Sequence, residues 1–403
     1  MKRKILSLIL IILLCFCGCN NEQKQKSNVK LDAISTIKEN INKDIQDIKN
    51  KTYQNISFSQ NVVVIIPDCD NVCELKMQLV NSADTNTQVA FVKQALEKWY
   101  PQGLNDTFIN DNLRINDELG RNLGDPSKPS PYNYAKLSDF PNEKNIVSLY
   151  LKTKDFSITT DGLSILDMSK GGISHILDGP NSLADRFDRF EEIETIYKEN
   201  SKDFVLQNKN YSYADVERYV NNLFVNELSS IKNPGISIHV PEITKFKLDE
   251  NSYALRVICA RTFNNVPFEY VISGTSYSAM SDGNNYISDM YSVDIMKPDD
   301  FDSIYGGSCS VKVTTSGEKS DKIIPVAELF DLMSEIFSSQ INLEVNKIEL
   351  VYTQRLINDT ETIGRPTWKV HGKNKINNQN IEAYVDALTG ECRYRRVGAI
   401  WDS

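Results

Sequence analysis

Two stretches in the second half of the chain share a residue pattern that constrains the fold. Segments 242–248 (EITKFKL) and 344–350 (EVNKIEL) place Glu, an aliphatic residue, Lys, an apolar residue and Leu at equal spacing. Each follows a predicted helix and precedes strand-like stretches, so the pattern predicts a helix followed by a small antiparallel sheet, used twice. Duplication and a chance likeness of two amphipathic units both explain it.

Helix signals occur in clusters rather than in strict alternation with strands. Ser212 and Asp215 have the spacing of a capping box, and Pro325 suits the first turn of a later helix. A helix is also predicted from residue 181 through Ile193 and Ile196. Strand-like segments, among them 62–66 (VVVII), dominate the remainder. This distribution predicts the α+β class: helix-plus-antiparallel-sheet modules, repeated in the C-terminal half.

The C-terminal segments PTWKVHGKN (366–374) and EAYVDALTGECRYR (382–395) carry a recognisable pattern. A Trp-containing strand followed by a strand ending in a Tyr-Val-Asp-x-x-Thr-Gly-Glu turn resembles the last hairpin of PepSY-like modules. Such modules occur in extracytoplasmic YycI, YycH and YpeB proteins of Gram-positive bacteria. Asp386, Thr389 and Gly390 would form the turn, because Gly permits positive φ and the Asp carboxylate accepts from nearby amides. The resemblance implies a non-enzymatic module that binds or restrains another extracytoplasmic protein.

The start of the chain has the composition of an export signal. Lys2, Arg3 and Lys4 precede an apolar run over 5–16, which is too short for a comfortable membrane span of about 20 residues. A short uncleaved anchor is the alternative. The residues Phe16-Cys17-Gly18-Cys19 resemble the lipobox of bacterial lipoproteins, with Cys19 as the lipid-bearing residue. We therefore expect a palmitate-type lipid anchor at Cys19, on the outer face of the cytoplasmic membrane.

Composition and spacing suggest several units behind this anchor. The chain has 403 residues, 40% hydrophobic and 25% charged, and a net charge of -9, which argues against nucleic acid as a partner. Isoleucines at 34, 37, 41, 45 and 48 form the stripe of an amphipathic helix that packs on the body or pairs with another copy as a coiled coil. The expected boundaries are 1–18 for the signal peptide, 19–58 for tether and helix, 59–200 for an N-terminal α+β domain, 201–310 for a helix-plus-sheet module, and 311–403 for the PepSY-like module.

Five cysteines lie beyond Cys19, at positions 69, 73, 259, 309 and 392. Cys69 and Cys73 could close a small loop as a disulfide, because an extracytoplasmic compartment permits such bonds. Two thiols that stay unpaired are the alternative. A zinc site is not expected, since no histidine is near this pair.

No catalytic or metal-binding pattern emerges from the remaining motifs. The three histidines, His175, His239 and His371, are far apart in sequence. The segment SGTSYSAM lacks the second glycine of a nucleophile elbow, and Cys309 has no partner at a diagnostic offset. We therefore expect no catalytic residue, cofactor or metal ion.

Three classes of function follow. The first is a lipid-anchored, non-catalytic protein that binds or regulates an envelope or membrane protein. The second is a solute-binding lipoprotein of an importer, which needs two lobes of alternating strands and helices. The third is an envelope hydrolase, which needs a nucleophile and base brought together from distant sequence.

Overall fold

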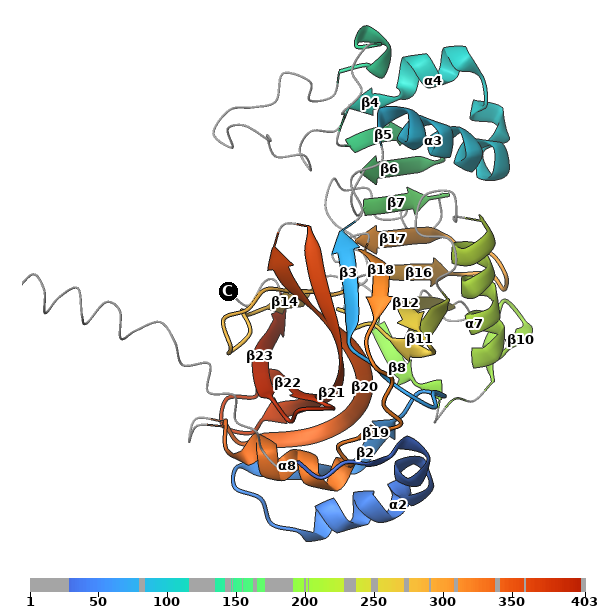
Figure 1. The fold of residues 1–403 in the computed structure, drawn as a ribbon. Coiled ribbons are helices and arrows are strands. Elements are labelled where there is room, and N and C mark those ends of the chain that lie inside the picture. The colour runs from blue at the N-terminus through green and yellow to red at the C-terminus, as the bar shows by residue number, and fades with distance from the viewer. Residues whose placement is uncertain are drawn as a thin grey trace, which may run out of the picture.

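The computed structural model describes residues 29–79, 84–115, 135–141, 146, 148–153, 155–161, 165–170, 191–198, 201, 203–227, 237–247, 253–271, 275–289, 291–307, 311–337, 341–358 and 360–399 (Figure 1). Two large sheets organise these residues, and the helices lie against them. The α+β class expected from the sequence is confirmed.

The first sheet, the middle sheet, is antiparallel throughout its described pairs. Its strand order is β4 (Arg114–Ile115), β5 (Ser148–Lys152), β6 (Ser157–Asp161), β7 (Ile165–Ser169), β17 (Ser303–Gly307), β16 (Tyr291–Ile295), β12 (Tyr253–Phe263), β11 (Ile238–Lys247) and β8 (Glu191–Ile196), with β13 (Val266–Pro267) beside β12. The helices α3 (Thr85–Trp99), α4 (Asp106–Asn112) and α7 (Tyr213–Asn222) accompany it. A small hairpin pairs β9 (Phe204–Leu206) with β10 (Lys209–Tyr211).

The second sheet, the C-terminal sheet, is built on long, curved strands (Figure 1). Its order is β14 (Thr275–Tyr277), β23 (Cys392–Ala399), β22 (Asn380–Asp386), β21 (Glu361–Asn374), β20 (Leu343–Asn358) and β15 (Tyr286–Ile287). β2 (Ile56–Ile65) runs parallel to β20, and β3 (Leu75–Leu79) pairs with β21 and with β18 (Val311–Ser316). Helices α2 (Ile34–Asn50) and α8 (Val326–Ser334) cover one face, and β1 (Asp32–Ala33) pairs with β19 (Lys322–Ile323).

The expected unit of a helix followed by an antiparallel meander is present twice in the second half. α7 precedes β11, β12, β16 and β17, whose neighbours follow chain order, and α8 precedes β20, β21, β22 and β23 in the same way. Glu242 and Glu344 lie in the first strand of their respective units. A third instance, which the sequence did not indicate, follows α3 and α4 with β4 to β7. β7, the last strand of the unit that follows α3 and α4, pairs antiparallel with β17, the last strand of the α7 unit. This pair joins the two units into the middle sheet.

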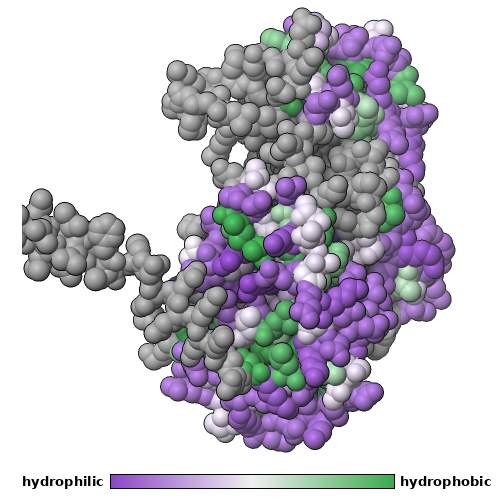
Figure 2. Space-filling view, viewed as in Figure 1, coloured by the Kyte–Doolittle hydropathy of each residue, from purple (hydrophilic) through white to green (hydrophobic). Residues whose placement is uncertain are grey.

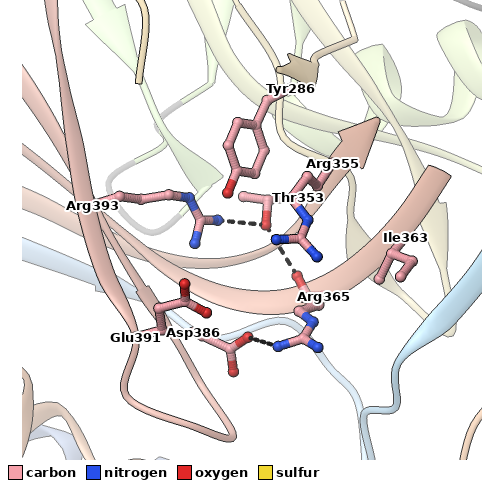
Figure 3. A pocket seen from close by; sticks show the side chains of 8 residues that line it. All are labelled: Tyr286, Thr353, Arg355, Ile363, Arg365, Asp386, Glu391 and Arg393. Carbon is pink, nitrogen blue, oxygen red and sulfur yellow. Dashed lines mark hydrogen bonds and ion pairs between the residues drawn. The ribbon is translucent and has the colours of Figure 1, made fainter. Parts of the chain in front are cut away.

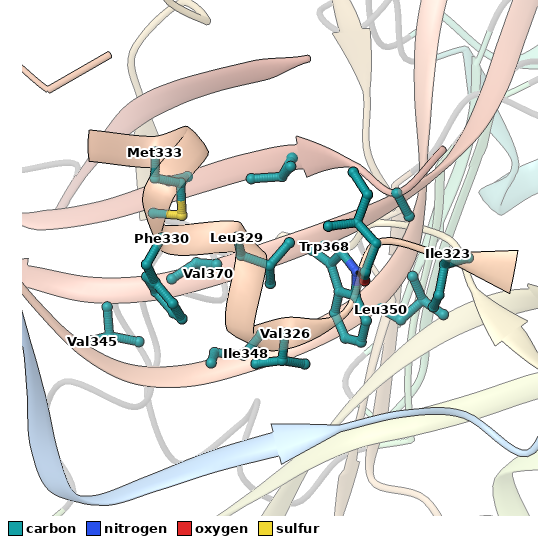
Figure 4. Packing of buried hydrophobic residues seen from close by; sticks show 14 of the residues in the cluster. Ile323, Val326, Leu329, Phe330, Met333, Val345, Ile348, Leu350, Trp368 and Val370 are labelled. Atoms are coloured by element: carbon teal, nitrogen blue, oxygen red, sulfur yellow. Dashed lines mark hydrogen bonds between the residues drawn. The ribbon is translucent and has the colours of Figure 1, made fainter. Parts of the chain in front are cut away.

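Each sheet has its own hydrophobic core. In the C-terminal core, Val326, Leu329 and Phe330 of α8 lie over apolar side chains of β20 and β21 (Figure 4). Trp368 is fully buried there, and its indole Nε1 donates to the carbonyl oxygen of Ile324 at 2.9 Å. Full burial of one such side chain contributes about 1.5–3 kcal/mol, so this face supplies much of the stability of the sheet.

The cores divide the chain differently from the expected boundaries. Residues 29–79 pack in the C-terminal core, and the position expected as a boundary, 58/59, falls inside β2. Strands of the expected 59–200 and 201–310 units share the middle sheet. The physical reason is that β2 finds its partner, β20, almost 300 residues away, and no local pattern encodes a pairing at that range.

Local helix signals agree with the structure more closely. α2 packs against α8 through a face that includes buried Ile34, Ile37 and Ile48, as expected for packing on the body. Ser212 and Asp215 form the predicted capping box at the start of α7. The helix predicted through Ile193 and Ile196 is wrong, because these residues lie in β8, which pairs with β11. Its expected start, at residue 181, lies outside the described residues. Of the described helices, none is long and apolar enough to cross a membrane.

Candidate functional site

The meander of the C-terminal sheet has one apolar and one polar face. Successive side chains of a strand point to opposite faces, so Ile348 and Leu350 of β20 enter the core beneath α8, whereas Lys347 and Glu349 point away from it. The same alternation continues along β21, β22 and β23. The polar face, defined here, consists of Lys347, Glu349, Thr353, Thr367, Lys369, His371, Glu382, Tyr384, Asp386, Arg393 and Arg395.

A segment from the middle of the chain covers part of this polar face. The backbone N–H of Glu269 donates to the carbonyl oxygen of Tyr352 at 2.7 Å, and Phe268 forms an isolated bridge with Tyr352. This attachment places the carboxylate of Glu269 over β21, β22 and β23, where it is fully buried. The polar face is therefore the contact between the middle segment and the C-terminal sheet.

Glu269 lies at the centre of a group of paired charges, the Glu269 cluster, which also contains Lys369, Glu382, Tyr384 and Arg395. Glu269 accepts from the Tyr384 hydroxyl at 2.9 Å and pairs with Arg395 at 2.5 Å. Glu382 pairs with Lys369 at 2.9 Å and with Arg395 at 2.6 Å. Each buried charge thus has an opposite partner, which is the condition for burying ions at tolerable cost.

A second group, the Glu349 cluster, continues the network along β20. Lys347 Nζ lies 3.0 Å from Glu349 and donates to the Tyr270 hydroxyl at 2.7 Å. His371 Nε2 lies 2.6 Å from Glu349 Oε1, and its Nδ1 lies 3.6 Å from Glu382. Lys369 also donates to the carbonyl oxygen of Tyr270 at 3.1 Å, which joins the two clusters.

The clusters set the protonation of their members. Burial alone would raise the pKa of Glu382, but Lys369 and Arg395 outweigh it and hold the pKa at about 2. Burial is likewise outweighed at Glu349, where the Lys347 ammonium is the largest influence that keeps the pKa well below its usual range. Burial lowers the pKa of His371 more than the adjacent Glu349 carboxylate raises it. These shifts keep Glu382 and Glu349 ionised and His371 neutral at pH 7.

Acid should destabilise the C-terminal sheet through these carboxylates. The pKa of Glu382 is about 2 in the folded chain against its usual 4.5, so the unfolded chain binds more protons between these values. The stability that Glu382 contributes is present above about pH 4.5 and is lost as the pH falls toward 2. We expect the urea midpoint to fall over this interval, and to fall less steeply in Glu382→Gln. Glu318→Gln, at an exposed position, should keep the wild-type slope; equal slopes in all three proteins would contradict the prediction.

At the end of the polar face beyond the Glu269 cluster, a pocket of about 270 Å³, its open mouth included, contains three arginines (Figure 3). Arg393 is 4% exposed; its Nη2 donates to the Thr353 hydroxyl at 2.8 Å and its guanidinium carbon lies 4.6 Å from the ring centre of Tyr286. Arg355 approaches Thr353 from the other side (Figure 3). Arg365 pairs with Glu74 at 2.9 Å and with Asp386 at 3.3 Å. We call this the arginine pocket.

The predicted turn lies at the rim of the arginine pocket. Oδ1 of Asp386 accepts from the amides of Leu388 and Thr389 at 3.0 and 2.9 Å, and the Gly390 amide donates to the Asp386 carbonyl oxygen at 2.9 Å. Gly390 has φ of +79°, and a Cβ there would lie 3.0 Å from Val29. The structure thus contains the turn that the Asp386, Thr389 and Gly390 pattern indicated, and uses the second Asp386 oxygen to orient Arg365.

The disulfide considered for Cys69 and Cys73 is not formed. Both residues are buried free thiols in the C-terminal core. The Cys69 amide closes a turn on the Pro67 carbonyl oxygen at 2.8 Å, whereas the Cys73 amide donates to the Tyr352 hydroxyl at 3.2 Å, so different partners fix the two backbones. Burial raises the pKa of the Cys69 thiol, which keeps it protonated at neutral pH.

The other sequence candidates stay apart. His239 lies 3.5 Å from Glu217, whereas His371 pairs with Glu349 and belongs to the Glu349 cluster, so the two histidines have different partners. Cys19, His175 and Cys309 lie outside the described residues. Within the part of the chain that the structure describes, no group of three His, Cys, Asp or Glu side chains could hold a metal ion.

The sequence did not indicate the polar face. The signal was present as charged residues at every second position, Lys347 with Glu349, Lys369 with His371, and Arg393 with Arg395. This alternation normally indicates a solvated face, and only the tertiary structure reveals that Glu269 buries it. Glu269 lies in a loop segment with no motif of its own.

Comparisons with known proteins give one informative likeness. No protein-family model matches the chain, and neither does any curated protein. A crystal structure of an uncharacterized protein from Eubacterium rectale matches with a TM-score of 0.51 and 11% identity, over 87% of this chain and 98% of that chain. At this identity the likeness shows the fold alone, and it agrees with the α+β architecture.

Proposed function

We propose that this chain is a non-catalytic binding protein, anchored through lipid on Cys19 to the outer face of the cytoplasmic membrane, that binds or regulates an envelope protein. The residues Phe16-Cys17-Gly18-Cys19 support the anchor, and the PepSY-like hairpin over 366–395 supports the binding role. Two signals of different kinds, one for location and one for the module, point to the same compartment.

The architecture is the observation that favours this function over solute import. An importer's binding protein usually has two α/β lobes in which strands and helices alternate along the chain. The described residues form helix-plus-meander units instead, and their sheets are antiparallel apart from the β2–β20 pair. Such units offer a partner their sheet edges and the part of the polar face that the Glu269 segment leaves uncovered, rather than a cleft between lobes.

The exposed surface fits recognition by polar groups. The face seen in Figure 2 is largely hydrophilic, and its apolar areas are separate from one another. The most exposed large apolar side chains come from distant parts of the described chain: Leu31, Leu104, Val205, Ile357 and Ile376. A reversible contact with another envelope protein suits this surface better than a permanent apolar interface does.

Crosslinking in intact cells, followed by mass spectrometry, tests the proposal. The wild-type chain should capture the same envelope protein or proteins in repeated experiments, and Cys19→Ala, which has no anchor, should lose most of the capture. Cys17→Ala is the matched control, because Cys17 would leave with the signal. Recovery of no neighbour above the Cys19→Ala background would overturn the proposed function.

A further inference from the structure

We propose that the arginine pocket binds a single carboxylate group, supplied by an acidic peptide segment of the partner protein. The inference rests on the proposed function for the source of the peptide. The pocket's own chemistry specifies the group that it binds.

The first observation that supports a carboxylate site is the environment of Arg393. Arg393 is 4% exposed, yet no carboxylate of the described residues lies within ion-pair distance of its guanidinium. Nη2 donates to Thr353, and Nε is buried without a hydrogen-bond partner. The next arginine on the same face, Arg395, is paired with both Glu269 and Glu382. A buried guanidinium that is satisfied by a hydroxyl and two aromatic rings alone leaves an orphaned donor beside the pocket.

The second observation that supports a carboxylate site is the position of Arg355. Arg355 lines the pocket from β20, and its guanidinium makes no hydrogen bond or ion pair with any described residue. Figure 3 shows its guanidinium and that of Arg393 on either side of the Thr353 hydroxyl. Two like charges facing the same space repel each other, whereas an anion between them would be stabilised by both and could receive paired N–H donors.

The remaining charges select the kind of anion. Asp386 is held by Arg365 and by the turn amides, and the exposed Glu391 lies at the rim. Arg365 is already paired with Glu74 and Asp386. The guanidiniums of Arg355 and Arg393 therefore remain for a ligand, and with the exposed Glu391 opposing them they carry one positive charge in excess. A monoanionic carboxylate neutralises this charge, whereas a phosphate dianion would be repelled by Asp386 and Glu391. The carboxylate also matches the planar fork of a guanidinium.

The test uses the full-length protein in detergent and a matched pair of peptides. The probes are acetyl-Gly-Glu-Gly-amide, its Gln counterpart and inorganic phosphate. The readout is the ¹⁵N–¹H signal of the arginine Nε groups. We expect the Glu peptide alone to shift the Arg393 signal, and Arg355→Gln to weaken its binding by about tenfold. Arg396→Gln, which replaces an exposed arginine of β23, the strand that carries Arg393, should bind the Glu peptide like wild type.

Three outcomes would overturn the inference: no Glu-dependent shift, equal binding by Arg355→Gln, or binding of phosphate in preference to the Glu peptide. Arg355→Gln should fold normally, because the guanidinium has no hydrogen bond or ion pair to lose among the described residues and Gln keeps the backbone pairing of β20. If the chain captures an envelope protein in cells but the Glu peptide does not bind, the proposed function stands and this site is wrong. If the Glu peptide binds but no envelope protein is captured, the site stands and the proposed function is wrong.

Discussion

Replacing Glu269 by Gln should lower the free energy of unfolding of the C-terminal sheet by about 3–5 kcal/mol. The substitution keeps the shape of the side chain and removes its charge. Arg395 and Lys369 would then remain buried with Glu382 as their shared partner. The cost is large because water cannot reach Glu269, which is fully buried, to compensate for the missing charge.

Urea unfolding followed by circular dichroism measures this effect, and Glu318→Gln at an exposed position is the control. The double variant Glu269→Gln/Arg395→Gln should lose less stability than the sum of the losses in the two single variants. Each single variant leaves the opposite charge without this partner, whereas the double variant removes both charges of the pair. An unchanged urea midpoint in Glu269→Gln would show that the cluster does not hold the middle segment on the sheet.

Replacing Trp368 by Ala should cost about 3–5 kcal/mol, through lost burial and the cavity left behind. Trp368 is 0% exposed beneath α8, and its indole satisfies the carbonyl oxygen of Ile324 immediately before that helix begins. The substitution therefore removes both the largest side chain of the core and a polar contact that fixes the entry to α8. Loss of this packing should also loosen the helix against β20 and β21 (Figure 4).

Two further variants separate these contributions. Trp368→Phe keeps most of the aromatic volume but leaves the Ile324 carbonyl oxygen unpaired, so its cost should be about 1–3 kcal/mol. Ile376→Ala, at a position that is 60% exposed, should change stability by no more than about 0.5 kcal/mol. If Trp368→Ala were no more harmful than Ile376→Ala, the packing of α8 on β20 and β21 would not stabilise the sheet.

Local chemistry was readable from the sequence because it depends on residues a few positions apart. The capping box of Ser212 and Asp215 and the turn at Asp386 to Gly390 are both present in the structure. The helix expected through Ile193 and Ile196 failed for the opposite reason. Pairing with β11 decides the conformation of these residues, and this pairing overrides their helical spacing.

The candidate site could not be predicted from the sequence, because it too depends on contacts between distant segments. Glu269 meets Lys369 and Arg395 across 100 and 126 positions of the chain, and Arg355 meets Arg393 only after β20 and β23 have joined one sheet. A sequence shows that such side chains are charged and that they alternate with apolar ones. It does not show whether water or another part of the chain covers them.

The sequence by itself determined the α+β class, the capping box at Ser212, the turn at Asp386 and the apolar stripe of α2. These features depend on periods of two and 3.6 residues and on short side-chain-to-backbone hydrogen bonds, all of which are local. Only the tertiary structure decided that residues 29–79 complete the C-terminal core, that Glu269 buries a charged sheet face, and that three arginines converge on one pocket. The physical reason is that strand pairing and burial join residues far apart in the chain, and their energies depend on which surfaces lose contact with water.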